Sequence, residues 1–324
     1  MTHAMRIHEP GGPENLVWEQ VEVPEPGPGE VVLDHKAVGL NYIDVYHRSG
    51  LYPVPGLPAT IGLEAAGVVT SLGDGVTDLA VGDRVAYASP PLGAYAERRV
   101  IPADKVVKLP DSIDDKTAAG MMLQGMTVEY LLRRTFRVEA GQTILVHAAA
   151  GGVGLMMCQW AKHLGVQVIG TVGSEEKAAL AKANGCDHTI LYRQEDFAEK
   201  VMEVTGGAGV PVIYDGIGAD TVEKGFDCLS PLGMMVSFGN ASGPMPEIPM
   251  AWLAKGSHFV TRPSLMAYNA ERDAMVASAQ ALFDVVASGA VAIDIRQTYP
   301  LAEAAQAHRD LEARNTTGTT VLTV

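Results

Sequence analysis

Residues 143–154 read TILVHAAAGGVG, and this stretch decides the fold. The first five residues form a short apolar run, and a helix-length segment follows the glycines and extends to about Gly165. Alanine and glycine make up nearly the whole turn between them. Such small residues let the backbone approach a bound pyrophosphate, and a helix N-terminus offers unpaired N–H groups and partial positive charge. The stretch therefore predicts the strand, turn and helix of a dinucleotide-binding site.

The turn is a variant of the dinucleotide fingerprint, with Ala149, Gly151 and Gly154 at its three small-residue positions. A glycine at position 154 lets the helix lie close to the strand. A glycine-rich turn by itself would be weak evidence, but this one lies between a predicted strand and a predicted helix, as the motif requires. The residues expected to approach the pyrophosphate are Ala150, Gly151, Gly152 and Val153.

Strands and helices alternate after this turn. Helix-length segments are predicted from Ser174 to about Asn184, from Glu195 and from Asp220. This spacing is typical of an α/β fold with a doubly wound parallel sheet covered on both faces. The predicted strands are Val166–Thr171, His188–Leu191, Val212–Asp215, Met234–Phe238 and His258–Thr261.

The two ends of the chain have a different pattern. The first ~120 residues read as β-rich, with short Val/Ile-rich segments between Gly and Pro turns. After Pro263 we expect a long helix from Glu271 to Ser288, a strand ending near Tyr299, a helix over 301–313 and a strand over Thr319–Thr323. The pattern alone allows these last elements either to cap the dinucleotide domain or to complete the N-terminal one. A length of 324 residues fits two domains.

Charge and composition exclude several classes of partner. The sequence has 24 Lys and Arg against 38 Asp and Glu, a net charge of −14. Such a surface repels phosphate backbones and anionic lipid, so nucleic acid and membranes are poor candidate partners. Apolar stretches end before the ~18 residues that a membrane-spanning helix needs. The N-terminus has no apolar signal segment, so we expect a cytoplasmic protein.

The end of the second strand indicates the cofactor. An NAD-selective site usually has an acidic residue there, which accepts hydrogen bonds from the ribose 2′-hydroxyl. This sequence has Gly173 and Ser174 instead, with Lys177 and Tyr192 further along. Small residues leave room for a 2′-phosphate, and Lys177 and Tyr192 can bind it by charge and hydrogen bond. Lys177 alone could equally be a solvated helix lysine, but without the acid the pattern favours NADPH.

Several stretches outside the fingerprint add a family resemblance that covers essentially the whole chain. The sequence resembles the zinc-free quinone oxidoreductases of the medium-chain dehydrogenase/reductase superfamily, relatives of zeta-crystallin, and especially their bacterial members. The similar stretches are GLNYID (39–44), RSGLYP (48–53), GDRV (82–85), HAAAGGVG (147–154), CQWAK (158–162), VSFGN (236–240) and TRPSL (261–265).

The resemblance implies a two-domain architecture. Residues 1–123 would form a catalytic domain of GroES-like β-barrel type, completed by residues 265–324. Residues 124–264 would form an inserted Rossmann NADPH-binding domain, and the cofactor would lie in the cleft between the two. Members of the family are commonly homodimers joined through the last Rossmann strand, which corresponds here to His258–Thr261. An unpaired edge strand is a ready interface.

The resemblance also assigns individual residues. Asn41 would lie near the nicotinamide, and Tyr46 and Tyr52 would line the substrate pocket. Gln124 would lie near the acceptor, at a position where bacterial relatives often carry Lys, and Gly216 stands where relatives have Ser. The remaining cofactor contacts would be Thr127, Gly173, Lys177, Tyr192, Phe238, Gly239, Arg262 and Arg314.

The same comparison argues against a metal site. Zinc alcohol dehydrogenases of this superfamily use a Cys where this chain has Asn41, and a Gly-His-Glu motif where it has Gly62-Leu63-Glu64. Leu63 cannot bind a metal, and no cysteine precedes Cys158 to form a structural zinc loop. We therefore expect no metal ligand set.

A zinc-free enzyme needs an acceptor that takes hydride easily. The resemblance implies an NADPH-dependent quinone reductase, because quinones and other conjugated carbonyls delocalise the negative charge that develops. Neutral donors such as Asn41 can stabilise that charge. The alternatives are an NADPH-dependent enone or enoyl reductase on the same fold, or a nucleic-acid-binding or structural role like that of the crystallins.

Overall fold

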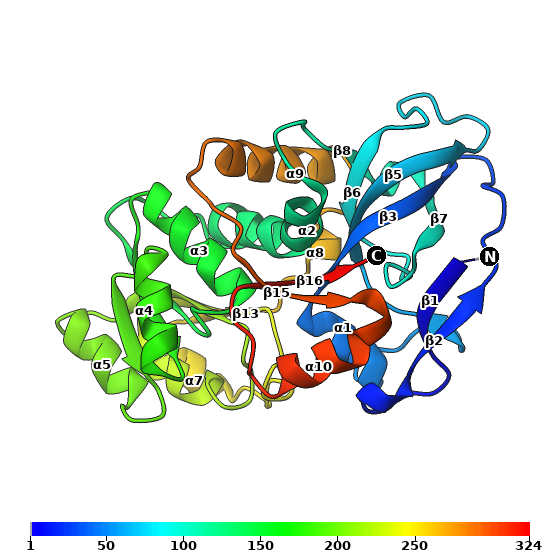
Figure 1. Ribbon diagram of the computed structural model, residues 1–324. Helices are drawn as coiled ribbons and strands as arrows, with labels where there is room; N and C mark the ends of the chain where they lie inside the picture. Colours follow the sequence, from blue (N-terminus) through cyan, green and yellow to red (C-terminus); the bar gives the residue numbers. More distant parts are fainter. Residues whose placement is uncertain (1) are drawn as a thin grey trace. The chain divides into compact units, whose positions relative to one another are not determined.

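The structure is a computed structural model, and it describes residues 2–324. The chain forms two compact units (Figure 1). Unit 1 comprises the residues up to Met126 together with Asn269–Ala287 and Ile293–Val324. Unit 2 comprises Thr127–Tyr268 and Ser288–Ala292. The C-terminal segment thus belongs mostly to the same unit as the N-terminal one.

Unit 2 contains one six-stranded sheet in the order β11-β10-β9-β12-β13-β14, and every pair in it is parallel. The strand order reverses direction at β9, which lies between β10 and β12. The carboxyl end of the central strands at such a reversal is where open α/β sheets bind ligands. The strands are β9 (Thr143–Val146), β10 (Gln167–Val172), β11 (His188–Leu191), β12 (Val210–Asp215), β13 (Leu229–Ser237) and β14 (Phe259–Thr261).

Helices connect these parallel strands. Helix α4 packs against β10 and β11, and α5 packs against β11. Buried apolar side chains from β9, β10, β12 and β13 form the core with Phe197, Val201, Val222 and Phe226. The helices of the unit are α3 (Gly152–His163), α4 (Glu175–Ala183), α5 (Phe197–Val204), α6 (Val222–Gly225), α7 (Met250–Ala254) and α8 (Leu265–Tyr268), with a π-helical turn over Leu131–Thr135.

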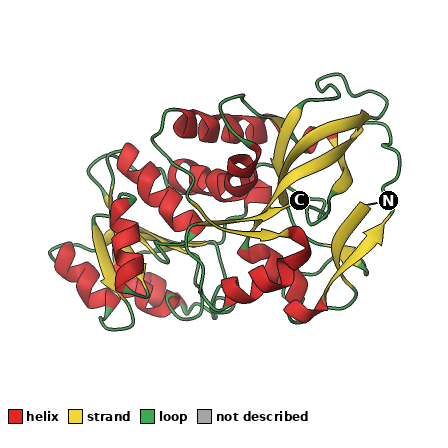
Figure 2. Cartoon of the chain, viewed as in Figure 1, coloured by secondary structure: helices red, strands yellow, loops and turns green. Residues whose placement is uncertain are grey.

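Unit 1 is built on a seven-stranded sheet, in which six strands follow the order β15-β16-β3-β5-β6-β8 and the seventh, β7, pairs with β3. A second sheet has the order β2-β1-β4. Figure 2 shows how strands predominate in this part of the chain. The strands are β1 (Thr2–Ile7), β2 (Leu16–Val21), β3 (Glu30–Leu40), β4 (Ala59–Thr60), β5 (Glu64–Leu72), β6 (Arg84–Ala88), β7 (Arg98–Pro102), β8 (Val107–Lys108), β15 (Ile295–Pro300) and β16 (Thr319–Thr323).

The C-terminal strand resolves the alternative that the sequence pattern left open. Strand β16 pairs antiparallel with β3, and Thr320 lies opposite Leu40. The last elements therefore extend the N-terminal sheet. The helices of unit 1 are α1 (Tyr42–Ser49), α9 (Arg272–Ala287), α10 (Ala304–Glu312) and most of α2 (Asp115–Tyr130), and single 3-10 turns cover Pro13–Asn15, Ala103–Lys105 and Leu301–Glu303.

The sequence pattern does not predict helices α1 and α2. Helix α1 is short, beginning after Asn41 and ending at Gly50, whose φ of 82° stops it. Helix α2 is buried along nearly its whole length, so it has no polar face to give a 3.6-residue period. Both carry residues of the candidate site.

The helix predicted from Asp220 is present but short. Helix α6 covers only Val222–Gly225, and a 3-10 turn over Phe226–Cys228 follows it. Strand β13 begins at Leu229, five residues before the expected Met234.

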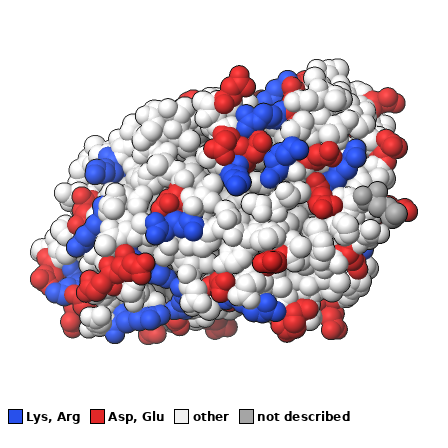
Figure 3. Space-filling model, in the orientation of Figure 1, with Lys and Arg blue, Asp and Glu red and all other residues white. Residues whose placement is uncertain are grey.

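Along residues 2–324, no helix is both long and apolar enough to cross a membrane. On the face shown in Figure 3, basic side chains lie interspersed with acidic ones.

Candidate functional site

The fingerprint turn lies at the carboxyl end of β9, at the reversal of the strand order in unit 2. Ala148 has a positive φ of 55°, and Gly151 is the N-cap of α3. A Cβ on Gly154 would lie 2.3 Å from the carbonyl oxygen of Ala148, so only glycine fits there. The first N–H groups of a helix lack partners within it. The turn therefore offers free donors and no side-chain bulk, which suits a pyrophosphate.

His147 supports this turn, and the sequence analysis gave it no role. Its Nδ1 lies 2.9 Å from the hydroxyl oxygen of Thr171, which joins the ends of β9 and β10. Its ring meets Phe197 edge-on at 5.0 Å. Burial lowers the pKa of His147, so the ring is neutral near pH 7. A buried histidine at a strand end cannot be distinguished from a core residue by sequence alone.

Two residues expected around a 2′-phosphate, Gly173 and Tyr192, lie side by side beyond β10, and a third, Lys177, lies in the first turn of α4. The hydroxyl oxygen of Tyr192 lies 3.1 Å from where a Cβ on Gly173 would stand. Ser174 is the N-cap of α4 and accepts a hydrogen bond from the backbone N–H of Lys177. The strand end therefore offers the Tyr192 hydroxyl beside a glycine backbone and a lysine on the following helix, without an acid at position 173 or 174.

The segments that follow the parallel strands β12 and β13 approach each other closely at Gly216. A Cβ on Gly239 would lie 2.3 Å from the carbonyl oxygen of Gly216, and the ring of Phe238 lies 3.1 Å from a Cβ position on Gly216. The Phe238 ring therefore occupies the space beside Gly216. Arg262 Nη1 donates to the hydroxyl of Ser237 at 3.2 Å and to the carbonyl of Gly239 at 3.0 Å. Arg262 thus holds this strand end in place.

Thr127 lies at the other end of this unit's sequence, on α2. Its side chain is buried and forms a hydrogen bond with the Tyr130 side chain. The Tyr130 ring stacks on Tyr268 with 4.5 Å between centroids, and the guanidinium of Arg134 lies over Tyr268. Burial raises the pKa of Tyr130, so its phenol is neutral.

In unit 1, Asn41 lies at the junction of β3 and α1. Its backbone N–H donates to Asp44 Oδ2 at 2.9 Å, which caps the helix. Its side-chain Nδ2 donates to Glu64 Oε2 at 2.6 Å. Gln124 Nε2 donates to Asn41 Oδ1 at 3.2 Å. The structure therefore brings the two predicted residues Asn41 and Gln124 into direct contact.

Glu64 is the residue of this group that the sequence analysis passed over. It is fully buried, and its Oε1 accepts the backbone N–H of Leu123 at 2.8 Å. Burial raises the pKa of Glu64 to about 8. In the sequence, Glu64 ends the stretch Gly62-Leu63-Glu64, which stands where zinc enzymes have Gly-His-Glu. That comparison suggests no role for Glu64 other than metal binding.

A second set of buried polar side chains adjoins Asp44. The Tyr95 hydroxyl donates to Asp44 Oδ2 at 3.1 Å and lies 3.0 Å from His308 Nε2. His308 Nδ1 lies 3.2 Å from Arg48 Nη1, and Arg48 forms two hydrogen bonds with Glu312, both at 2.8 Å. Burial raises the pKa of Asp44 to about 7 and lowers that of His308 to about 3. This set anchors α1 beneath Asn41.

The predicted pocket tyrosines also pack together. Tyr46 and Tyr52 meet edge-on with 5.1 Å between ring centroids, and the Tyr52 backbone N–H donates to the Tyr46 carbonyl at 3.0 Å. Tyr42 lies 5.6 Å from Tyr46. Arg314 has a positive φ of 60° and lies near Tyr42; burial raises the pKa of the Tyr42 phenol, and the charge of Arg314 opposes that rise. The aromatic residues thus line one side of α1.

Within residues 2–324 no group of three or more His, Cys, Asp or Glu side chains is arranged to hold a metal ion. Leu63 is buried beside Glu64, where a zinc enzyme would have a ligand.

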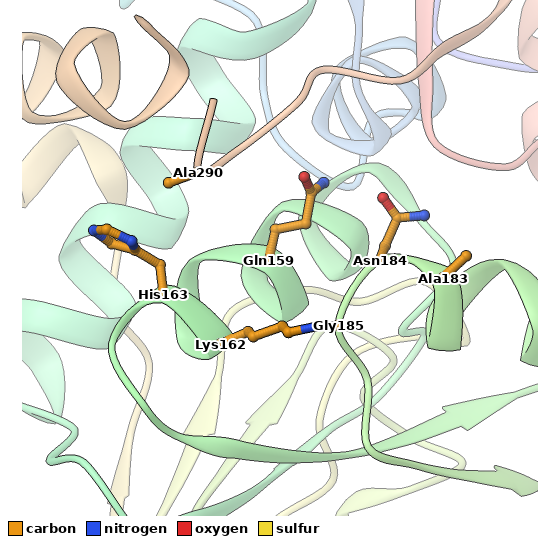
Figure 4. Close-up of a pocket in the computed structure, with 7 residues that line it drawn as sticks. All are labelled: Gln159, Lys162, His163, Ala183, Asn184, Gly185 and Ala290. Carbon is orange, nitrogen blue, oxygen red and sulfur yellow. The ribbon is translucent and has the colours of Figure 1, made fainter. Parts of the chain in front are cut away.

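A surface pocket of about 270 Å³ lies elsewhere in unit 2 (Figure 4). Helix α3 begins at the carboxyl end of β9, so its last residues, Lys162 and His163, lie at the opposite edge of the sheet from the fingerprint turn. The pocket is therefore separate from the candidate cofactor site. It is lined by Gln159, Lys162, His163, Ala183, Asn184, Gly185 and Ala290.

Comparison with known proteins places the chain in a family. Residues 27–111 match the alcohol dehydrogenase GroES-like domain, and residues 152–281 match the zinc-binding dehydrogenase family. A quinone oxidoreductase of Pseudomonas aeruginosa is 53% identical over 96% of both chains. A 2-haloacrylate reductase of a Burkholderia species is 48% identical over 99% of both.

A solved structure extends the similarity to the fold. The quinone oxidoreductase of Escherichia coli complexed with NADPH has a TM-score of 0.98 and 45% identity, and the alignment covers 99% of this chain and 100% of that one. With a Rossmann-type sheet in unit 2 and a GroES-like domain in unit 1, the chain belongs to the quinone oxidoreductase family of the medium-chain dehydrogenase/reductase superfamily.

Proposed function

We propose that this protein is an NADPH-dependent quinone reductase that transfers hydride to a quinone without a metal. The observation that carries the proposal is the match over nearly the full chain to quinone oxidoreductases, one of them solved with NADPH. The fingerprint turn and the strand end after β10 have the chemistry that this cofactor needs. The buried pair Asn41 and Gln124 supplies neutral polar groups where zinc relatives would have a ligand.

The residues of unit 2 fit NADPH. The backbone of Ala150, Gly151, Gly152 and Val153 would hold the pyrophosphate, because Gly154 lets α3 begin directly against the strand end and its first N–H groups face the turn. Lys177 and Tyr192 would bind the 2′-phosphate over Gly173. When bound, NADPH supplies the hydride for the reaction. The remaining proposed contacts are Thr127, Phe238, Gly239 and Arg262, with Arg314 from unit 1.

The residues of unit 1 would orient the acceptor and stabilise its charge. Asn41 and Gln124 are neutral, so they can donate to an oxygen on which negative charge develops without fixing a metal or a full positive charge there. Tyr46 and Tyr52 would give the planar ring an aromatic wall. Such a site suits a quinone, whose reduced form spreads the charge over the ring.

A direct test is to follow oxidation of NADPH by 1,4-benzoquinone under anaerobic conditions and to identify hydroquinone as the product. NADH serves as the matched control for cofactor choice. We expect stoichiometric hydroquinone and a clear preference for NADPH. No turnover with any simple quinone would contradict the proposal.

A second candidate activity is reduction of the C=C bond of an α,β-unsaturated carbonyl. It is favoured by the 48% identity to a 2-haloacrylate reductase over nearly the full chain. The same neutral site would stabilise an enolate as well as a hydroquinone anion. An enone in the acceptor assay distinguishes the two.

We also propose a cytoplasmic homodimer. Strand β14 is an edge of the unit 2 sheet, and Phe259 and Val260 on it are 55% and 37% exposed. Leu232 is also exposed, at 66%. An apolar edge strand is suited to pairing with a second copy of itself. Light scattering should give twice the chain mass, and Val260→Pro, which removes a donor from the edge, should give a monomer.

The two units correspond, in this proposal, to a catalytic domain of residues 1–123 completed by 265–324 and an NADPH-binding domain of residues 124–264.

A further inference from the structure

A continuous run of side-chain hydrogen bonds crosses the interior of unit 1. The Thr319 hydroxyl on β16 donates to Gln124 Oε1 at 3.0 Å, and Gln124 Nε2 donates to Asn41 Oδ1. Asn41 Nδ2 then donates to Glu64 Oε2. All four side chains are buried. Each donor points toward Glu64, so the run has a direction and ends on a carboxyl group.

Two glycines leave room for this run of side-chain hydrogen bonds. A Cβ on Gly39 would lie 2.2 Å from Glu64 Oε2 and 2.3 Å from the carbonyl oxygen of Ala119. A Cβ on Gly120 would lie 2.5 Å from the Thr319 side chain. The close approach of β3, α2 and β16 therefore depends on both glycines, and a larger residue at position 39 would displace the carboxyl group.

Backbone N–H groups of α2 fix one oxygen of the Glu64 carboxyl group. Oε1 accepts the N–H of Leu123, and the N–H of Met122 also bonds to this carboxyl group. A backbone N–H can only donate, so Oε1 serves best as an acceptor whether Glu64 is ionised or neutral. A proton on Glu64 is therefore expected on Oε2, the oxygen that faces Asn41.

We propose that Glu64 is a positioning residue that sets which end of the Asn41 carboxamide faces it. Ionised Glu64 holds the amide NH₂ group, and neutral Glu64, whose Oε2 carries a proton, holds the amide oxygen. Gln124 and Thr319 can follow the turn, because each is both a donor and an acceptor. The backbone N–H of Asp44 keeps its bond to the Asn41 carbonyl at 3.0 Å in either state.

The groups around Glu64 place this change near neutral to weakly alkaline pH. Burial raises the pKa of Glu64, and the nearby carboxyl group of Asp44 raises it further. Tyr87 on β6 and Tyr95 also lie near Glu64, and burial raises the pKa of both phenols, so both remain neutral. The hydrogen-bond partners of Glu64 are neutral amides. Burial also raises the pKa of Asp44, but Asp44 accepts the backbone N–H of Asn41 and does not contact its amide, so ionisation of Glu64 is the change that reverses the run.

The consequence for the reaction rests on the proposed role of Asn41 beside the cofactor or acceptor. Within the run Asn41 uses one N–H and one oxygen lone pair, which leaves one of each for another partner. Turning the amide exchanges the positions of the remaining N–H and the remaining oxygen lone pair. Asn41 then presents a donor where it had presented an acceptor, so turnover should change with the protonation state of Glu64.

Neutron diffraction from deuterated crystals tests the proposal without any activity, because deuterons distinguish the amide nitrogen from the oxygen. Crystals are compared well below and well above the pKa of Glu64. We expect the Asn41 oxygen toward Glu64 and a deuteron on Oε2 at low pD, and the Asn41 ND₂ group toward Glu64 at high pD. The same Asn41 orientation at both values would overturn the proposal.

The variant Glu64→Gln gives a second, independent test. The backbone N–H of Leu123 should donate to the amide oxygen of the introduced glutamine. The NH₂ group of that glutamine then faces Asn41 and holds the Asn41 oxygen toward itself at every pH. The wild-type kcat/KM should therefore change across the pKa of Glu64, and that change should be absent in Glu64→Gln. A persistent change would overturn the proposal. If quinones are not reduced at all, only the proposed function fails, and the diffraction result stands.

Discussion

The side chains of Gln124 and Asn41 come from separate parts of unit 1, and the Gln124 amide donates to the Asn41 amide oxygen over 3.2 Å. Both are buried, at 7% and 6% exposure, so the contact is shielded from water. A buried neutral hydrogen bond contributes roughly 1 kcal/mol, and a buried acceptor left unpaired costs about 1–3 kcal/mol. Gln124 thus helps to hold the Asn41 side chain in place.

The variant Gln124→Met removes this donor with little change in volume. We expect kcat/KM for a quinone to fall about tenfold, in line with the loss of one buried hydrogen bond, while the Kd for NADPH changes little. Thr319→Val is the graded control. Thr319 contacts Gln124 and not Asn41 itself, so this variant should lower kcat/KM less than Gln124→Met does. For both variants, steady-state kinetics measure kcat/KM and cofactor titration measures the Kd for NADPH. An equal or larger loss in Thr319→Val would contradict this order.

The 2′-phosphate site predicts a cofactor-specific effect. A charge-assisted contact contributes roughly 1.5–3 kcal/mol, so Lys177→Ala should weaken NADPH binding about ten- to a hundredfold and leave NADH binding nearly unchanged. Lys182, an exposed lysine on the same helix, provides the control Lys182→Ala. Fluorescence titration with each cofactor measures the Kd. An equal loss for both cofactors would exclude a 2′-phosphate role for Lys177.

The raised pKa of Glu64 predicts that the stability of the folded protein depends on pH. The folded-state pKa of about 8 lies above the ordinary value of 4.5, so the folded protein retains the proton longer than the unfolded chain. The contribution of Glu64 to folding is therefore fully present below the ordinary pKa and is lost as the pH rises through about 8. In Glu64→Gln the fall in Tm across this window should be smaller than in the wild type. Identical Tm profiles would show that Glu64 is not the titrating group.

Metal independence is a further prediction, which rests on Leu63 and on the lack of cysteines before Cys158. Elemental analysis of active protein should give far less than one zinc per chain. Activity should survive dialysis against a chelator. Stoichiometric zinc together with loss of activity on chelation would refute this prediction.

The sequence predicts unit 2 well and the acceptor side of unit 1 poorly, for a physical reason. The strands of unit 2 are continuous apolar runs beside glycine turns, so β11 is predicted to the residue and β9 to within one. Helix α2 is buried on all sides and so shows no helical period. Glu64 and His147 acquire their contacts only through pairing of distant strands, as when the Asn41 amide reaches across 23 positions to Glu64. No local pattern records such a contact.

The central claim, that a quinone is the preferred acceptor, is tested most directly by kcat/KM with NADPH for 1,4-benzoquinone, an enone and a saturated aldehyde. A site of neutral donors stabilises a charge that is spread over a conjugated system better than one held on a single alkoxide oxygen. We predict that the quinone is reduced faster than the enone and that the aldehyde is not reduced. An enone preferred by tenfold or more would contradict the quinone assignment and favour the alkene reductase.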